Sequence, residues 1–555
     1  MTPVSAPPLR RGRRARRRGV RLVSVGALVA LTAGACGAPL PKPEPGANPA
    51  AYSGLAVDAD RIDYAIGKLS DIVDEELEAR GVPGAAVAVV HDGEVAAAEG
   101  FGVRSSETDD EVDADTVFGL STLSASVSAT VVAAAAKQDE DAVGWSTPVQ
   151  EQLPWFALSD PAISPMVTVG DLFAHRSGLP AGAGDDLAAL GHDRPTVLHG
   201  LRHLPLDGFR SSYAPTDFGL TAGAEAVTVA AGLPWAELAE EGLFDPLDME
   251  RSSYSHEEFL EFTNRAENHI RGGDPDGTWV PAPPGDGEDV RAPAGGLSSS
   301  VNDMARWMTM VLDGGEGPGG SDVVPADALR EALTPQATAS PPDAAADRTS
   351  SSGYGFSISD SSSGRVQWEQ PATPAQRSGA SVLMMPSLDL GLVTLTNAPA
   401  SGAAETITSR FADLAQYGDP AVRWGEYYDR ALAPARAPAG DLAGQTAPTS
   451  PQESRPLDEL VGTYENDYFG PVRIGRDGNE LLLEPGRNRE PWRLEHWDGD
   501  TFAASPAGGD WPAGTRGSVT FDDDEVTLDL LDSSGLGTFT RVAGVEEGGA
   551  EVSDG

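Results

Sequence analysis

The segment from residue 115 to residue 136, DTVFGLSTLSASVSATVVAAAA, concentrates hydroxyl side chains just ahead of an alanine run. Its hydroxyl residues between positions 121 and 128 are Ser121, Thr122, Ser124, Ser126 and Ser128. A hydroxyl becomes a catalytic nucleophile when a neighbouring base takes its proton. The segment itself contains no lysine, and the next lysine along the chain is Lys137. The ordinary explanation is therefore that these hydroxyls are solvated or cap a helix, and a catalytic role needs a base from elsewhere in the chain.

Histidines are the next residues that could do chemistry. His199 and His203, in VLHGLRH, are four residues apart and would share one face of a helix, as two metal ligands do. A zinc site needs at least a third protein ligand, and no glutamate of an HExxH pattern lies between them. The sequence therefore favours a structural role for this pair, and we predict neither a metal nor a cofactor.

The amino terminus has the pattern of an export signal. Eight arginines lie between residues 10 and 21, and the apolar run LVSVGALVALTAGAC follows. The run ends at Cys36, the only cysteine, after the small residues Ala33, Gly34 and Ala35. This resembles a bacterial lipobox, in which the cysteine becomes the acylated first residue. We expect export and a lipid anchor at Cys36 on the outer face of the bacterial cytoplasmic membrane; the alternative is an ordinary secretory signal.

The charge balance limits the partners. The formal net charge is −46, and without the signal the chain carries 31 basic against 85 acidic groups, or −54. A field of this sign repels nucleic acids and anionic lipid surfaces. A solvated acidic surface is the simplest interpretation. Since there is one cysteine, no disulfide can form within the chain.

Two stretches rich in Pro, Ala and Gly divide the chain. The first, GAPLPKPEPGANPAAYSG, follows Cys36, and the second, APARAPAGDLAGQTAPTSPQESR, covers residues 433 to 455. We predict a signal, a linker, a large domain, a second linker, a β-domain and an acidic tail at residues 1–36, 37–55, 56–430, 431–455, 456–545 and 546–555.

The large domain should be α+β. Apolar residues from Ile62 to Leu77 recur at helical spacing and stop at Gly81. AAVAVVHDGEVAAAEGFG then reads as a strand, an Asp92-Gly93 turn and a returning strand, and SVLMMPSLDLGLVTLTN gives a second strand pair. These patterns predict an antiparallel sheet flanked by helices, closed by the two ends of the domain, with an inserted helical subdomain. Short strands with Asp-rich turns predict a small C-terminal all-β barrel or sandwich.

Six stretches resemble the β-lactamase and penicillin-binding-protein-like serine hydrolases, the group that includes class C β-lactamases. They are GVPGAAVAVVHDGEVAAAEGFG, DADTVFGLS, VTVGDLFAHRSGLP, LFDPLDMERSSY, APAGGLSSSVNDMARWMTMVLDGG and GLVTLTN, in the family's order. The tail from LDELVGTYENDYFG to GLGTFTR resembles a β-domain that follows many of these hydrolases. In this family the histidine of AHRSGLP, His175, belongs to a framework turn.

The resemblance implies three catalytic clusters: a Ser-x-x-Lys pair, a Tyr-x-Asn loop and a Lys- or His-Thr-Gly strand. Counted from Phe118, the first pair falls on Thr122 and Ala125, or on Ser121 and Ser124 one residue earlier. In the second cluster Tyr213 keeps the tyrosine, and Pro215 stands in place of the asparagine. The third falls on Pro371, Ala372 and Thr373. Each cluster has therefore lost a residue that the family's chemistry needs.

We interpret these losses as a retained fold without its chemistry. The expected protein is a surface lipoprotein that binds a cell-wall fragment, a small ester or amide ligand, or a protein partner of unspecified type. The alternative is an active esterase, amidase or β-lactamase that uses a nucleophile within residues 121–126 together with Tyr213. A third alternative is an assembly role for the C-terminal β-domain, with a vestigial cleft.

Overall fold

The computed structural model describes residues 53–136, 143–271, 277–282, 288–340, 348–370, 378–399, 401–486, 491–506 and 511–542. Clustering of backbone contacts separates Met1–Lys42 from a second unit, Pro43–Gly555. The predicted signal, Cys36, the third family cluster at Pro371, Ala372 and Thr373, and the acidic tail at 546–555 lie outside the described residues.

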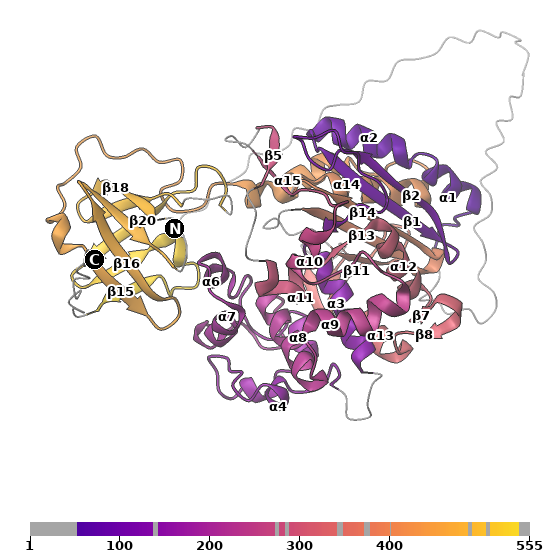
Figure 1. Ribbon diagram of the computed structural model, residues 1–555, viewed down its shortest axis with the longest axis horizontal. Coiled ribbons are helices and arrows are strands. Elements are labelled where there is room, and N and C mark those ends of the chain that lie inside the picture. Colours follow the sequence, from indigo (N-terminus) through magenta and orange to yellow (C-terminus); the bar gives the residue numbers. More distant parts are fainter. Residues whose placement is uncertain are drawn as a thin grey trace, which may run out of the picture. The chain divides into compact units, whose positions relative to one another are not determined.

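An antiparallel sheet of eight strands organises the first domain, in the order β2-β1-β14-β13-β12-β11-β10-β9 (Figure 1). The strands are β1 (Gly84–His91), β2 (Glu94–Gly102), β9 (Ala337–Ser340), β10 (Ser350–Ser352), β11 (Ser357–Asp360), β12 (Val366–Gln370), β13 (Gly379–Met385) and β14 (Leu390–Thr396). The first strand pairs with the last, from Ala85 opposite Thr396 to His91 opposite Leu390. The predicted closure of the sheet by the two ends of the domain is confirmed.

The hairpin between β1 and β2 turns where the sequence predicts it. Asp92 and Gly93 have φ angles of 51° and 74°, the left-handed values that a tight two-residue hairpin turn requires. Strand β1 is apolar throughout because both its faces are covered. Its alternate residues belong to two different cores, Val87 to one and Ala88 to the other.

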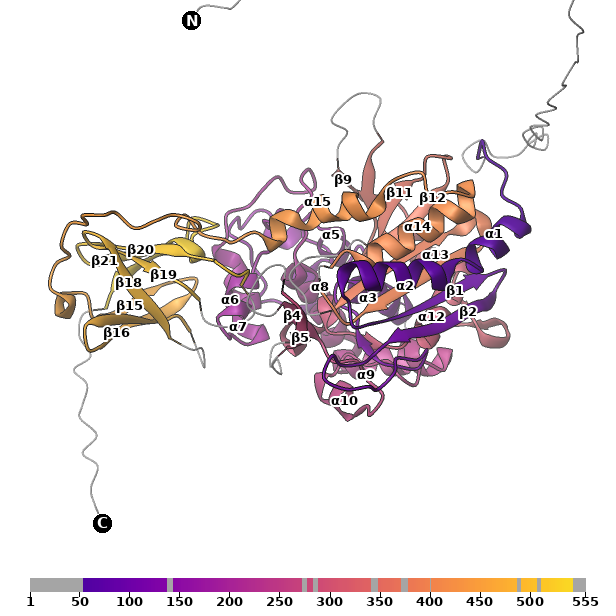
Figure 2. The same cartoon turned by 90° about the horizontal axis from the view of Figure 1, so that it is seen from above.

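Helices cover both faces of the sheet. The core on one face includes residues of α1 (Ala59–Ile66), α2 (Leu69–Arg80) and α14 (Ala403–Tyr417). These helices lie against the sheet in Figures 1 and 2. The apolar spacing from Ile62 to Leu77 is shared by two helices, because α1 ends at the C-cap residue Gly67 and α2 begins at Leu69. Helix α15 (Trp424–Arg436) packs on α14 and continues past the predicted boundary at residue 430.

The opposite face carries the predicted helical insertion between β2 and β9. Its main helices are α3 (Leu123–Ala135), α8 (Asp217–Ala231) and α12 (Val301–Leu312). The shorter ones are α4 (Val149–Gln152), α5 (Val169–Phe173), α6 (Asp185–Ala189), α7 (Arg194–Gly200), α9 (Trp235–Ala239), α10 (His256–Glu261), α11 (Ala292–Gly295) and α13 (Ala326–Ala332). Helix α3 lies at the centre, and its residues from Leu123 to Ala134 are all buried. Among the described residues no helix is long and apolar enough to cross a membrane.

The C-terminal domain is a closed antiparallel barrel. Its strands are β15 (Gly462–Asn466), β16 (Gly470–Asp477), β17 (Glu480–Glu484), β18 (Trp492–Asp498), β19 (Thr501–Ala504), β20 (Gly517–Asp522), β21 (Glu525–Leu528) and β22 (Thr538–Arg541). Pairing of β15 with β22 closes the ring, which decides between the predicted barrel and sandwich. Buried aromatic residues fill it, including Tyr464, Phe502, Phe521 and Phe539. Independent folding of residues 456–545 stays a prediction.

Candidate functional site

The candidate site lies where the short strand β3 (Phe118–Gly119) leads into helix α3. Strand β3 pairs with β6 (Ser298–Ser299), and the Leu120 amide donates to the Leu297 carbonyl over 2.7 Å. Ser121 then takes a φ of 59°, a left-handed value that is uncommon for a residue other than glycine. Thr122 returns to helical dihedral angles and precedes α3. The change of direction at Ser121 thus sets where Thr122 and the first turn of α3 lie.

The first turn of α3 places Thr122 and Ala125 one turn apart, the spacing a hydroxyl and its base would need. The Ala125 amide donates to the Thr122 carbonyl over 3.0 Å. Ala125 is 6% exposed and ends in a methyl group, which cannot accept a proton. The backbone of Gly355 packs against this turn so closely that a Cβ there would lie 2.4 Å from the Ala125 oxygen. A hydroxyl and a methyl group therefore stand one helical turn apart, where the family resemblance implies a serine and a lysine.

The other hydroxyls of this segment form hydrogen bonds inside the protein. Ser124 Oγ donates to the Ser121 carbonyl over 2.6 Å and accepts from the Leu297 amide over 3.0 Å. Ser126 Oγ donates to the Gly355 carbonyl over 2.7 Å and to Gln370 Oε1 over 3.2 Å.

Ser128 Oγ and the Tyr254 hydroxyl are 2.7 Å apart, and Ser128 Oγ donates to the Pro293 carbonyl. Ser124, Ser126 and Ser128 have no exposed surface, so the prediction that these hydroxyls are solvated is wrong. Helix α3 is enclosed on all sides, and buried hydroxyls need protein partners.

Tyr213 lies in the loop before α8, a helix that packs on α3. Burial raises the pKa of the Tyr213 hydroxyl. A tyrosine accepts a proton only as phenolate, so a raised pKa makes the basic form scarcer at neutral pH. Pro215, which replaces the family asparagine, is exposed, and its carbonyl accepts from the Gly182 amide over 2.9 Å. Proline offers no side-chain amide and no backbone donor to a substrate.

His175 is half-buried beneath this loop. Burial lowers the pKa of its imidazole to about 4, against a smaller opposing effect of Asp217, so the ring is neutral at pH 7. Its Nδ1 accepts from the Thr216 amide over 3.3 Å, and its carbonyl accepts from the Ala214 amide over 2.9 Å. The ring meets that of Tyr213 edge-on, with centroids 5.8 Å apart. These contacts hold the Tyr213 loop, as expected of a framework residue.

His199 and His203 do not face one another as a ligand pair. His199 lies in the last turn of α7 and packs on Trp155, with ring centroids 4.3 Å apart. Its Nδ1 is 3.0 Å from Arg202 Nη2. His203 ends the following 3₁₀ turn, Leu201–His203. Within the described part of the chain, no group of three or more His, Cys, Asp or Glu residues could hold a metal ion.

A cavity of about 30 Å³ opens beside Ser121, which is enough for a water molecule. Polar side chains among its lining residues are Ser121, His256, Asn268, Ser298 and Ser378. Ser378 also donates to the Gly119 carbonyl. The sequence did not single out His256, Asn268 or Ser378, because more than 130 residues separate each from Ser121 and no local pattern marks them.

The fold and the arrangement around α3 are those of a serine β-lactamase or penicillin-binding protein. The family model described as Beta-lactamase matches residues 69–417, and a domain of unknown function, DUF3471, matches residues 446–530. The chain therefore belongs to the Beta-lactamase family and carries a C-terminal DUF3471 domain.

Relatives span bacteria, fungi and archaea. Penicillin-binding protein 4 of Amycolatopsis lactamdurans is 30% identical over 414 residues, covering 70% of this chain and 95% of that protein. Unguisins hydrolase ungD of Aspergillus violaceofuscus is 25% identical over 478 residues, covering 78% and 82%. The octameric penicillin-binding protein homologue from Pyrococcus abyssi has a TM-score of 0.56 at 19% identity, covering 84% and 98%. This last likeness supports the fold alone.

Proposed function

We propose that this chain is a catalytically degenerate member of the Beta-lactamase family that binds a ligand without turning it over. The observation that carries the proposal is Ala125, a buried methyl group one helical turn after Thr122. Loss of a general base lowers the rate of such a reaction by roughly 10²- to 10⁴-fold. The hydroxyl at Thr122 also carries a β-branch that restricts the rotamers from which it could attack.

The second cluster supports the same proposal. A hydroxyl without an amine could still react if Tyr213 took its proton, but burial of Tyr213 disfavours the phenolate. Pro215 removes the amide that would orient a substrate. The ligand we propose is a cell-wall fragment or another small ester or amide.

Hydrolysis tests the proposal directly. A chromogenic cephalosporin and p-nitrophenyl acetate should be hydrolysed no faster by the wild type than by a Thr122→Ala variant. A soluble peptidoglycan fragment should meanwhile give saturable binding by calorimetry. Wild-type hydrolysis at least tenfold above that of Thr122→Ala would overturn the proposal.

An active hydrolase is the second candidate. It is favoured by the retained Tyr213 and by the name of one relative, a hydrolase that shares 25% identity with this chain. The N-terminal end of α3 would also stabilise negative charge developing beside Thr122. This candidate requires Ser121 or Thr122 as nucleophile, and loss of a measurable wild-type activity in either Ser121→Ala or Thr122→Ala would support it.

We further propose that the mature protein starts at Cys36 and is lipid-anchored outside the cytoplasmic membrane. The basic run followed by LTAGAC motivates this proposal. Metabolic labelling with a fatty-acid analogue should tag the wild type and spare Cys36→Ala. Equal labelling of both proteins would contradict it.

A further inference from the structure

Helix α15 is the last helix before the linker to the barrel, and it buries little apolar surface. Of its residues from Trp424 to Arg436, only Leu432 is buried. Apolar burial is usually the main force that holds a helix on its domain. Polar contacts must therefore carry an unusually large share of the attachment of α15.

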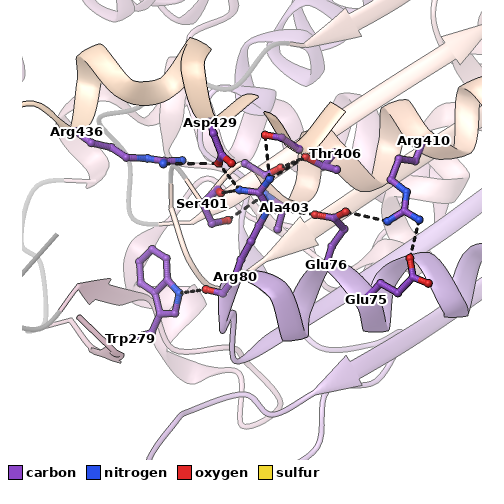
Figure 3. Close-up of polar contacts among 12 residues, drawn as sticks. Glu75, Glu76, Arg80, Trp279, Ser401, Ala403, Thr406, Arg410, Asp429 and Arg436 are labelled. Carbon is purple, nitrogen blue, oxygen red and sulfur yellow. Dashed lines mark hydrogen bonds and ion pairs between the residues drawn. The ribbon is translucent and has the colours of Figure 1, made fainter. Parts of the chain in front are cut away.

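Arg80, at the end of α2, is the centre of those contacts (Figure 3). Its Nη1 donates to Asp429 Oδ1 on α15 over 2.7 Å and to the Ser401 carbonyl over 2.6 Å. Its Nη2 donates to the Gly425 carbonyl at the start of α15 over 3.3 Å. Its Nε contacts Glu76 Oε2 over 3.1 Å. One guanidinium thus ties α15 to α2 and to the segment before α14; we call this contact set the Arg80 clasp.

Two carboxyl groups near α15 are withdrawn from solvent to different degrees, since Glu405 is buried and Glu369 is half-buried. Glu405 is in the first turn of α14 and is 5% exposed, and the charges of Arg80 and Arg436 act on it. Glu369 is on β12 and accepts from the Ser359 hydroxyl. Burial raises the pKa of both carboxyl groups, and the two arginines offset this only in part for Glu405.

Helix α15 supplies part of the enclosure of both acids. The charges of Glu369 and Glu405 act on the Tyr428 hydroxyl, which is 2.9 Å from Ser409 Oγ on α14. Burial and these neighbouring acids raise the pKa of Tyr428, so its hydroxyl stays protonated. On the same helix, Asp429 faces Arg80, and burial lowers the pKa of Arg436. The groups that face the two acids therefore come from α2, α14 and α15.

We propose that α15 is a strap whose docking over the Arg80 clasp and these two acids loosens as pH rises. In the docked state the enclosure favours the protonated acids, and in the open state water lets them ionise near their ordinary pKa of about 4.3. Opening then releases protons, so the open population rises with pH from about 4.3 up to the raised values of the docked state. Each acid contributes up to a tenfold rise per pH unit within that window.

Release of α15 would change the reach of the barrel. The strap contains 13 residues, and an extended chain spans at most about 3.3 to 3.6 Å per residue. The tether between the two domains would therefore lengthen by up to roughly 45 Å. This consequence holds whether or not the site at α3 turns over a substrate.

Hydrogen exchange on the full chain tests the strap. Protection of residues 424–436, corrected for the pH dependence of chemical exchange, should fall at least tenfold between pH 4.5 and pH 8.5, while α14 keeps its protection. In Glu369→Gln/Glu405→Gln, where neutral amides replace the protonated acids, protection should stay high at both pH values. Glu426→Gln, on the exposed side of α15, is the matched control and should keep the wild-type slope.

Two results would overturn the proposal. One is equal protection of α15 at both pH values in the wild type, and the other is an unchanged slope in the double variant. If the double variant does not fold, Glu369→Gln alone decides, because it should remove a part of the slope that Glu426→Gln leaves intact.

Discussion

Ala125 on α3 and Pro215 before α8 stand where the family resemblance implies an amine and an amide, whereas near α15 the ionisable groups Glu369, Glu405 and Arg80 gather. We interpret the first region as a family site without its proton carriers. The second has no counterpart among the motifs of the sequence and is rich in titratable groups. Position in a fold therefore does not by itself say where its acid–base chemistry lies.

The largest loss in the free energy of unfolding should come from removing the contacts of Arg80. Arg80→Ala removes the charged donor shared by Glu76, Asp429 and the Ser401 carbonyl. Glu76 keeps its ion pair with Arg410 and Asp429 is largely solvated, so the expected cost is that of lost hydrogen bonds to a charged group, about 1.5 to 3 kcal/mol each. Urea denaturation of the full chain should show a loss of this size. Arg423→Ala, whose ion pair with Glu426 is solvated, should change stability by less than about 1 kcal/mol. Similar losses in both variants would contradict a buried clasp.

The framework histidine beneath the Tyr213 loop predicts an acid-sensitive stability. Because burial lowers the pKa of His175 to about 4, unfolding lets it take up a proton at any pH below its ordinary value of about 6.5. The free energy of unfolding should fall by about 3 kcal/mol between pH 6.5 and pH 4 on account of this group. His175→Gln should flatten that part of the profile. A wild-type slope in the variant would mean that His175 is protonated in the fold.

The buried hydroxyls of α3 should matter for stability. Ser128→Ala leaves the Tyr254 hydroxyl without one of its partners, which costs about 1 to 3 kcal/mol. Thermal unfolding should detect the loss. Ser362→Ala, an exposed hydroxyl, provides the comparison and should be nearly neutral. A neutral Ser128→Ala would indicate that the α3 hydroxyls are dispensable for packing.

Partial repair of the first cluster should have the smallest effect. Thr122→Ser removes one methyl group at an almost buried position and should recover little acylation, because catalytic groups that act as a unit are strongly non-additive. Thr122→Ser with Ala125→Lys should give at most trace acylation, since the Tyr-x-Asn cluster stays incomplete. Incubation with benzylpenicillin and peptide mapping of residues 118–130 would measure it. Full recovery in the double variant would show that Pro215 is no obstacle.

The sequence predicts those parts of the fold that depend on neighbouring residues. The Asp92-Gly93 hairpin and the paired strands β13 and β14 follow from local turn chemistry and apolar runs. The break at Gly67 was missed because the apolar spacing continues across it. Closure of the barrel rests on pairing of β15 with β22, far apart in the chain, so barrel and sandwich could not be separated.

The two regions also differ in how far the sequence predicts them, because one is marked by local motifs and the other depends on residues far apart in the chain. Thr122, Ala125, Tyr213 and Pro215 could be named by counting from motifs, and the structure places the first pair at the start of α3 and the second before α8. The buried state of Ser126 and Ser128 could not be predicted, because it depends on Gly355 and Tyr254 more than 120 residues away. The Arg80 clasp was invisible for the same reason, since Asp429 is 349 residues from Arg80.

The central claim is that the chain is not acylated because Ala125 stands one helical turn after Thr122, where the family resemblance implies a lysine. Mass spectrometry of the wild-type protein after exposure to benzylpenicillin and to a fluorophosphonate tests this most directly. The account predicts an unmodified mass with both reagents. An adduct on the peptide spanning residues 118–130, abolished by Thr122→Ala or by Ser121→Ala, would contradict it and make this chain a hydrolase with an unassigned base.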